Sequence, residues 1–214
     1  ALLAIGQTDV MRLVAFTSIS HFGFIVLGIF VMTSQGLSGS SFYMVNHGFS
    51  TGALFLVMGY LVSRRGSKRI SDFGGVQKVA PILTGVFLIS GLSGLALPGM
   101  SSFISEFLVL TGTYAVNPTA AIIATLGIVL AAVYILWLYQ RMMTGLPSSE
   151  VAETVKEISR RELFAVAPIL AIIISLGFVP QVALNVINPA VEQVQTYVGV
   201  TDPEAVVVSE GSGS

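Results

Sequence analysis

The chain has 214 residues, of which 54% are apolar and only 10% are charged, with a formal net charge of −1 and a mean hydropathy of +0.87. This composition indicates an integral membrane protein rather than a water-soluble globular domain. The absence of cysteine excludes disulfides, thiolate metal sites and cysteine nucleophiles, and two histidines far apart in the sequence make a poor metal site. No redox cofactor or metal is therefore expected in this chain.

Three long stretches, residues 13–63, 79–140 and 163–191, contain no Asp, Glu, Lys or Arg other than Glu106. Each is long enough for one or more spans of about 20 residues, the length that crosses a bilayer. Residues 1–12 lack the pattern of a signal peptide and are interpreted as the end of a preceding helix followed by a cytoplasmic turn. The sequence thus predicts an all-α integral membrane protein of about five transmembrane helices, the C-terminal part of a longer chain.

Turn-forming Gly, Ser, Asn and Pro residues divide these stretches into helices. The string SQGLSGS, residues 34–40, is expected to separate the first two helices. Loops are expected at 63–78 and 141–162, and an acidic external tail at 192–214. Within a bundle that covers residues 13–191, the predicted spans are 13–33, 41–62, 79–116, 118–140 and 163–187.

The third span is too long to be one straight helix. Its roughly 38 residues would extend about 57 Å at 1.5 Å per residue, nearly twice the thickness of the hydrocarbon core. Pro98 lacks an N–H and clashes with the preceding turn, and Gly99 beside it adds conformational freedom. We therefore expect two half-helices that meet near residues 97–101.

Lys and Arg residues indicate the orientation, because they are retained on the cytoplasmic side of a membrane. Arg12 and the basic residues of the loops 63–78 and 141–162 fall on one side at every predicted crossing. The C-terminus is therefore expected to face outward. Within the second loop, residues 148–159 are expected to form a short helix with Ser148 or Ser149 as N-cap, interpreted as a solvated connector rather than a docking site.

Glu106 is the one carboxylate inside the predicted spans, and it follows the helix break by about two turns. An ionisable group costs about 2.5 to 3.5 kcal/mol at the centre of a membrane helix and usually marks an ion pathway. Broken helices with exposed backbone groups occur where they line a cavity or pathway. The alternative is a kink that only shapes packing, with Ser101, Ser102 and Ser105 satisfying the free carbonyl groups.

Both histidines stand on helix faces that also carry hydroxyl groups. Residues three or four apart share a helix face. By this rule His21 is grouped with Thr17 and Ser18, and His47 with Tyr43, Ser50 and Thr51. Taken singly, each histidine is interpreted as a structural residue, whereas the two together with Glu106 favour a proton relay.

The chain resembles a known family, the M-type antiporter-like subunits of bacterial proton-pumping NADH:quinone oxidoreductase, respiratory complex I. The segments that carry the resemblance include TDVMRLVAFTSISHFGFIVLGIF, MVNHGFSTGALFLVMG and LSGLALPGMSSFISEFLVL. The resemblance covers nearly the whole chain. Related L-type, N-type and cation/proton-antiporter subunits usually carry lysine at the position of Glu106, so the glutamate favours the M type.

The resemblance implies a fold of fourteen transmembrane helices, of which this chain would supply the last five, the broken twelfth included. It also implies that Glu106 is the key acidic residue of that broken helix, with His47 and His21 as the histidines of the eleventh and tenth helices. FMN, iron–sulfur clusters and quinone are expected in partner subunits. Other expected partners are L-type and N-type subunits and the lipid bilayer, and no nucleic acid is expected to bind. The expected location is the bacterial cell (inner) membrane.

The resulting hypothesis is that protons pass through His47 and neighbouring hydroxyls to Glu106 and are released outward, driven by quinone reduction elsewhere in the complex. A subunit of a cation/proton antiporter is one alternative. A structural membrane scaffold is the other, and such a scaffold would not need Glu106.

Overall fold

The computed structural model describes residues 1–203, and the expected tail residues Glu204 and Glu210 lie outside this part. The described residues form helices and no named strand, in agreement with the all-α prediction. The elements are α1 (Leu2–Ile5), α2 (Val10–Phe30), α3 (Ser34–Arg65), η1 (Ile70–Asp72), α4 (Val76–Val79), α5 (Pro81–Gly94), α6 (Ser101–Val116), α7 (Pro118–Met143), α8 (Ser149–Thr154), α9 (Arg160–Phe178) and α10 (Gln181–Val198).

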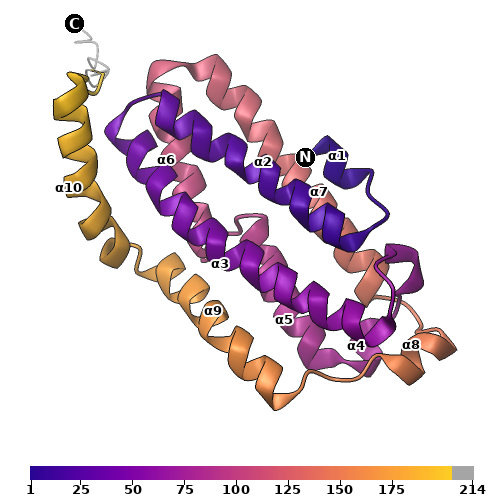
Figure 1. The fold of residues 1–214 in the computed structure, drawn as a ribbon. Helices are drawn as coiled ribbons and strands as arrows, with labels where there is room; N and C mark the ends of the chain where they lie inside the picture. Colours follow the sequence, from indigo (N-terminus) through magenta and orange to yellow (C-terminus); the bar gives the residue numbers. More distant parts are fainter. Residues whose placement is uncertain (204–214) are drawn as a thin grey trace, which may run out of the picture.

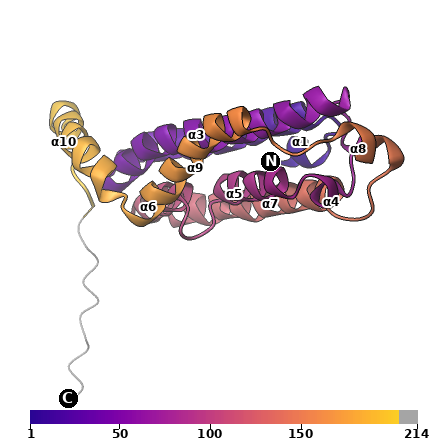
Figure 2. The same ribbon diagram turned by 90° about the horizontal axis from the view of Figure 1, so that it is seen from below.

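The long helix α3 is the centre of the bundle (Figure 1), where it packs against α2, α5, α6, α9 and α10. Seen from below, α3 lies in one layer, and α5 and α7 lie in a second layer beneath it (Figure 2). Four described helices, α2, α3, α7 and α9, are long and apolar enough to cross a membrane, and α5 is a shorter apolar helix. Together with the broken pair α5 and α6, they confirm the predicted membrane class.

The predicted break in the third span is confirmed. Helix α5 ends at Gly94, and α6 begins at Ser101. Between them the backbone takes positive φ values at Ala96 (53°) and Gly99 (92°), a region that residues with a Cβ rarely adopt. The two half-helices are therefore not joined as one continuous helix. The irregular backbone between them lies beside α9.

The end of α9 covers this break closely. A Cβ placed on Gly177 would collide with the carbonyl oxygen of Gly99, and Phe178 lies 3.6 Å from the position of a Cβ on Gly99. Irregular backbone at membrane depth is tolerated where protein covers it. The absence of a side chain at Gly177 thus allows α9 to shield the loop between the half-helices.

The expected loop at residues 34–40 is wrong, because α3 begins at Ser34 and the connection from α2 is only residues 31–33. Thr33 caps α3, with its Oγ1 accepting from the N–H of Gly36 at 3.0 Å. The glycines that suggested a turn instead allow close packing. A Cβ on Gly36 would lie 2.8 Å from the carbonyl oxygen of Gly28, and one on Gly39 would lie 2.8 Å from the backbone nitrogen of Val109.

The last predicted span, 163–187, is also wrong as a single helix. Helix α9 ends at Phe178 and α10 starts at Gln181, because Pro180 cannot continue the hydrogen bonding of α9. The expected tail from residue 192 is helical as far as Val198. The loop regions are likewise shorter than predicted, since α3 extends to Arg65, α7 to Met143, and α9 begins at Arg160.

The connecting segments 66–80 and 144–159 lie together at one end of the bundle (Figure 1). The N–H of Gly75 donates to the carbonyl of Thr144 at 2.8 Å, and Arg65 pairs with Glu150. Ser148 is the N-cap of α8, as predicted, but Val151 and Val155 are buried in the core. The interpretation of this segment as a solvated connector is therefore wrong for its inner face.

Candidate functional site

Five buried polar side chains from four helices meet in the middle of the bundle. They are His21 of α2, Tyr43 and His47 of α3, Glu106 of α6 and Tyr134 of α7, and none is more than 6% exposed. Since α6 starts only after the break, the loop of residues 95–100 sets where Glu106 enters the bundle.

Tyr43 is the direct partner of the carboxylate. Its hydroxyl donates a hydrogen bond to Oε1 of Glu106. The tyrosine ring centre also lies 6.0 Å from that of His21 and 6.3 Å from that of His47. Tyr43 therefore stands between the carboxylate and the two imidazoles.

The two histidines contact each other through Nδ1, with 3.3 Å between the nitrogens. Nε2 of His21 lies 3.2 Å from the hydroxyl of Tyr134, and Nε2 of His47 lies 2.8 Å from Oγ of Ser18. A neutral imidazole has one N–H donor and one acceptor nitrogen. The four groups can thus form one continuous hydrogen-bonded row, in which Tyr134 donates to His21, His21 to His47, and His47 to Ser18.

A row of this kind can pass a proton by reversing its bonds in sequence, because each imidazole can take a proton on one nitrogen and release it from the other. Thr51 supports the row from the same helix, with its Oγ1 at 3.2 Å from Nδ1 of His47. Each side chain of this row has a hydrogen-bond partner, as buried polar groups usually do.

Two of the predicted hydroxyls do not contact the histidines in the way the helix faces suggested. Thr17 donates to the carbonyl of Val14 at 2.8 Å, and Ser50 donates to the carbonyl of His47 at 3.4 Å. Ser18 was grouped with His21 but lies against His47 of the neighbouring helix.

The three serines of α6 lie where this helix meets α3 and α5. Ser102 lies 3.5 Å from Oγ of Ser93 on the other half-helix. Ser105 accepts a hydrogen bond at 2.7 Å from Nδ2 of Asn46, which also donates to the carbonyl of Ser101 at 3.0 Å.

Asn46, Tyr134 and Ser93 were not singled out from the sequence. Asn46 directly precedes His47, so its polar side chain in an apolar helix was the available signal. Tyr134 and Ser93 offered no comparable signal, because a single Tyr or Ser in a membrane span is common and gives no partner.

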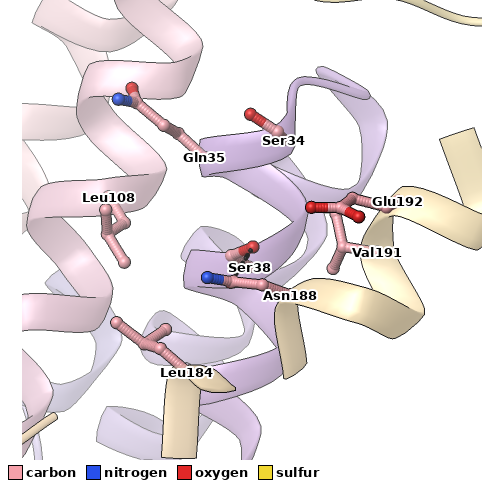
Figure 3. A pocket seen from close by; sticks show the side chains of 8 residues that line it. All are labelled: Ser34, Gln35, Ser38, Leu108, Leu184, Asn188, Val191 and Glu192. Carbon is pink, nitrogen blue, oxygen red and sulfur yellow. Dashed lines mark hydrogen bonds between the residues drawn. The ribbon is translucent and has the colours of Figure 1, made fainter. Parts of the chain in front are cut away.

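The bundle also has a surface pocket of about 230 Å³ among α3, α6 and α10 (Figure 3). Its polar lining includes Ser38, whose hydroxyl donates to Oδ1 of Asn188 at 2.9 Å. Leu108 lines it from α6. Because residues two apart point to different sides of a helix, this pocket and Glu106 lie on different sides of α6. Among residues 1–203, no group of three or more His, Asp or Glu side chains could hold a metal ion.

The fold and the site define a polytopic α-helical membrane protein in which a broken helix places a carboxylate against a tyrosine that packs beside a histidine pair. The chain belongs to the family described as NADH:quinone oxidoreductase/Mrp antiporter, TM, whose model matches residues 1–132.

Relatives with a similar sequence are NADH-quinone oxidoreductase subunits M. The chain is 56% identical over 203 residues to that of Mycobacterium tuberculosis (strain H37Rv), which covers 95% of this chain and 36% of the relative. It is 37% identical over 198 residues to that of Rhodobacter capsulatus, covering 92% of this chain and 39% of the relative. The chain therefore spans little more than a third of the length of these curated relatives.

Solved structures agree with this family. A chain of respiratory complex I from Thermus thermophilus with bound NADH matches with a TM-score of 0.85 and 30% identity, over 92% of this chain and 42% of that chain. The archaeal membrane-bound sulfane sulfur reductase matches with a TM-score of 0.77 over 82% of this chain and 29% of that chain; at 24% identity, this likeness shows the fold alone.

Proposed function

We propose that this chain is the proton-translocating part of an M-type membrane subunit of NADH:quinone oxidoreductase. The observation that carries the proposal is the position of Glu106, a buried carboxylate just after a helix break, bonded to Tyr43, whose ring lies beside the paired histidines. The relatives named subunit M support the assignment to this complex. Quinone reduction in partner subunits, which hold FMN and iron–sulfur clusters, would supply the energy.

In this proposal, His21 and His47 carry the proton and Glu106 receives it through Tyr43. The row from Tyr134 to Ser18 gives the histidines defined donors and acceptors, so proton transfer needs only small movements. The Tyr43 hydroxyl is bonded to the carboxylate, and its ring packs beside both imidazoles. In this proposal the hydroxyl gives its proton to Glu106 and takes a replacement proton from the histidine side through bridging water. Glu106 then releases the proton outward.

The proposed setting is a bacterial inner membrane with the C-terminus outward. All ten Lys and Arg residues lie in or beside the segments at one end of the bundle, which is the pattern of a cytoplasmic face. L-type and N-type antiporter-like subunits are the proposed neighbours.

Replacement of Glu106 by Gln tests the proposal. The amide preserves size and hydrogen bonding but cannot titrate, so we expect assembly to persist while pumping falls about tenfold or more. The measurement is proton uptake by inverted membrane vesicles during NADH oxidation, normalised to the amount of assembled complex. Glu192→Gln, at an exposed position of α10, is the matched control.

Wild-type pumping by the Glu106→Gln variant would refute the role of this carboxylate. The family description also names Mrp antiporters, so the alternative is exchange of a cation for protons. Proton movement driven by an imposed sodium gradient, without NADH and lost in Glu106→Gln, would favour that alternative.

A further inference from the structure

Helix α6 begins in the middle of the bundle without a capping side chain from its own N-cap residue. Its N-cap residue, Met100, makes no side-chain cap hydrogen bond among the described residues. The preceding loop has left-handed backbone at Ala96 and Gly99. The first turn of α6 therefore depends on neighbouring helices for its position.

Asn46 of α3 does not cap the free N–H groups of α6, but it contacts the first turn through its amide donor. Its Nδ2 donates to the carbonyl of Ser101 at 3.0 Å and to Oγ of Ser105 at 2.7 Å, and the side chain is fully buried. The carbonyl of Ser101 can only accept a hydrogen bond, which fixes the amide with its NH₂ group toward α6. Both hydrogens of Nδ2 are thus used to hold one turn of α6.

That turn leads directly to Glu106, which follows Ser105 in the chain. Asn46 and Tyr43 lie three residues apart on α3, so they share a face of this helix. Asn46 bonds Ser101 and Ser105, and Tyr43 bonds the Glu106 carboxylate. These contacts set the register of α6 against α3 at the site.

We propose that Asn46 is a positioning residue for Glu106: it anchors the first turn of α6 to α3 and so keeps the carboxylate in hydrogen-bonding contact with Tyr43. The inference rests on the proposed function for its consequence in pumping, but its geometric content is independent of that function. A displacement of about 1 Å is enough to slow a positioned transfer strongly.

The test uses the assembled complex with Asn46→Leu, Ser105→Ala and the double variant. A hydrophobic carbodiimide, which modifies protonated carboxyls, is applied to membranes, and the labelling rate of Glu106 is followed by peptide mass spectrometry. Ser90→Ala is the matched control, because this buried serine of α5 donates only to the carbonyl of Val86 in its own helix.

Asn46→Leu should raise the labelling rate of Glu106 about tenfold, since two buried hydrogen bonds that hold the turn are lost. Labelling of the exposed Glu192 should stay unchanged, and pumping per assembled complex should fall several-fold. Ser105→Ala should act in the same direction with a smaller effect. The double variant should show less than the combined effects of the two single changes, because both remove the hydrogen bond between Asn46 and Ser105.

Unchanged labelling of Glu106 in both single variants, or strictly additive effects, would overturn the inference. If Asn46→Leu does not assemble, the comparison of Ser105→Ala with Ser90→Ala still tests the inference. Only Ser105→Ala should change the labelling rate of Glu106. Wild-type pumping in Glu106→Gln together with altered labelling in Asn46→Leu would refute the proposed function and leave the positioning role intact.

Discussion

At the scale of single residues, the arrangement of the site depends on which atom of each imidazole faces which neighbour. The contact between the two Nδ1 atoms of His21 and His47 requires that one donates and the other accepts. Their Nε2 atoms point to Tyr134 and Ser18 at the two ends of the row. In the proposed function, the pair exchanges a proton within this row.

Tyr43→Phe should lower NADH-driven proton pumping about tenfold, because it removes the one hydrogen bond that the described residues provide to the Glu106 carboxylate. Assembly should be preserved, since the ring remains. Proton uptake by inverted vesicles is the measurement. Tyr139→Phe is the control, as that ring stacks on Phe87 at 5.9 Å, in another part of the bundle. Equal pumping in the two variants would rule out a role for the Tyr43 hydroxyl.

At the scale of helices, α3 organises the molecule and is held at both ends. At its C-terminal end, Arg64 forms a salt bridge with Glu162 at 2.5 Å. At its N-terminal end, Asp202 accepts from the N–H of Ser34 at 2.7 Å and from its hydroxyl at 2.5 Å. A carboxylate at this position also interacts favourably with the helix dipole. The segment after α10 thus fixes the start of the central helix.

The contact with Asp202 predicts a dependence on pH. The hydroxyl of Ser34, followed by its backbone N–H, lowers the pKa of Asp202 below its usual 3.8. A lowered pKa in the folded state means that the stabilisation is present at neutral pH and is lost as the pH falls through the lowered value. Asp202→Asn should therefore speed hydrogen exchange in the first turn of α3 at pH 7, and the difference from wild type should shrink as the pH falls below 3.8 and through the lowered pKa of Asp202.

The measurement is backbone hydrogen exchange of the assembled protein by mass spectrometry, with each pH corrected for the intrinsic rate. Glu192→Gln removes an exposed carboxylate from the same end of the molecule and should leave the first turn of α3 unaffected. A difference between Asp202→Asn and wild type that persists undiminished at low pH would contradict the role of the charge.

At the scale of the whole molecule, charge divides the bundle into two unlike ends. The basic residues gather around η1, α4 and α8, where Arg141 also stacks over the ring of Trp137 at 4.9 Å. Aromatic and basic side chains together are typical of a membrane interface. The opposite end, with the start of α3 and the end of α10, carries Glu192 and Asp202.

This asymmetry predicts opposite labelling of two introduced cysteines. The 214 residues contain no cysteine, so each variant has a single thiol in this chain. Ser71→Cys, in η1, should react with a membrane-impermeant maleimide only in inside-out vesicles, whereas Thr196→Cys, in α10, should react only in right-side-out vesicles. Both positions are exposed. Reaction of both thiols from the same side would contradict the proposed orientation.

The sequence by itself determined the membrane class, the helix break near Pro98 and the three titratable residues of the site. These features depend on local properties: the length of an apolar run, the missing N–H of proline, and the cost of a charge in hydrocarbon. It also placed His21, His47 and Glu106 in three different spans, but it did not indicate which hydroxyl would serve which group.

Only the tertiary structure decided those partners. Helical periodicity defines the face of a residue but not the rotation and height of one helix against the next, and these set every contact between helices. Ser18 therefore contacts His47 rather than His21. Asn46 and Tyr134 belong to the site although no sequence motif predicted them. For the same reason residues 34–40 form a helix: their glycines serve close packing against α2 and α6, a requirement that exists only once the three helices are brought together.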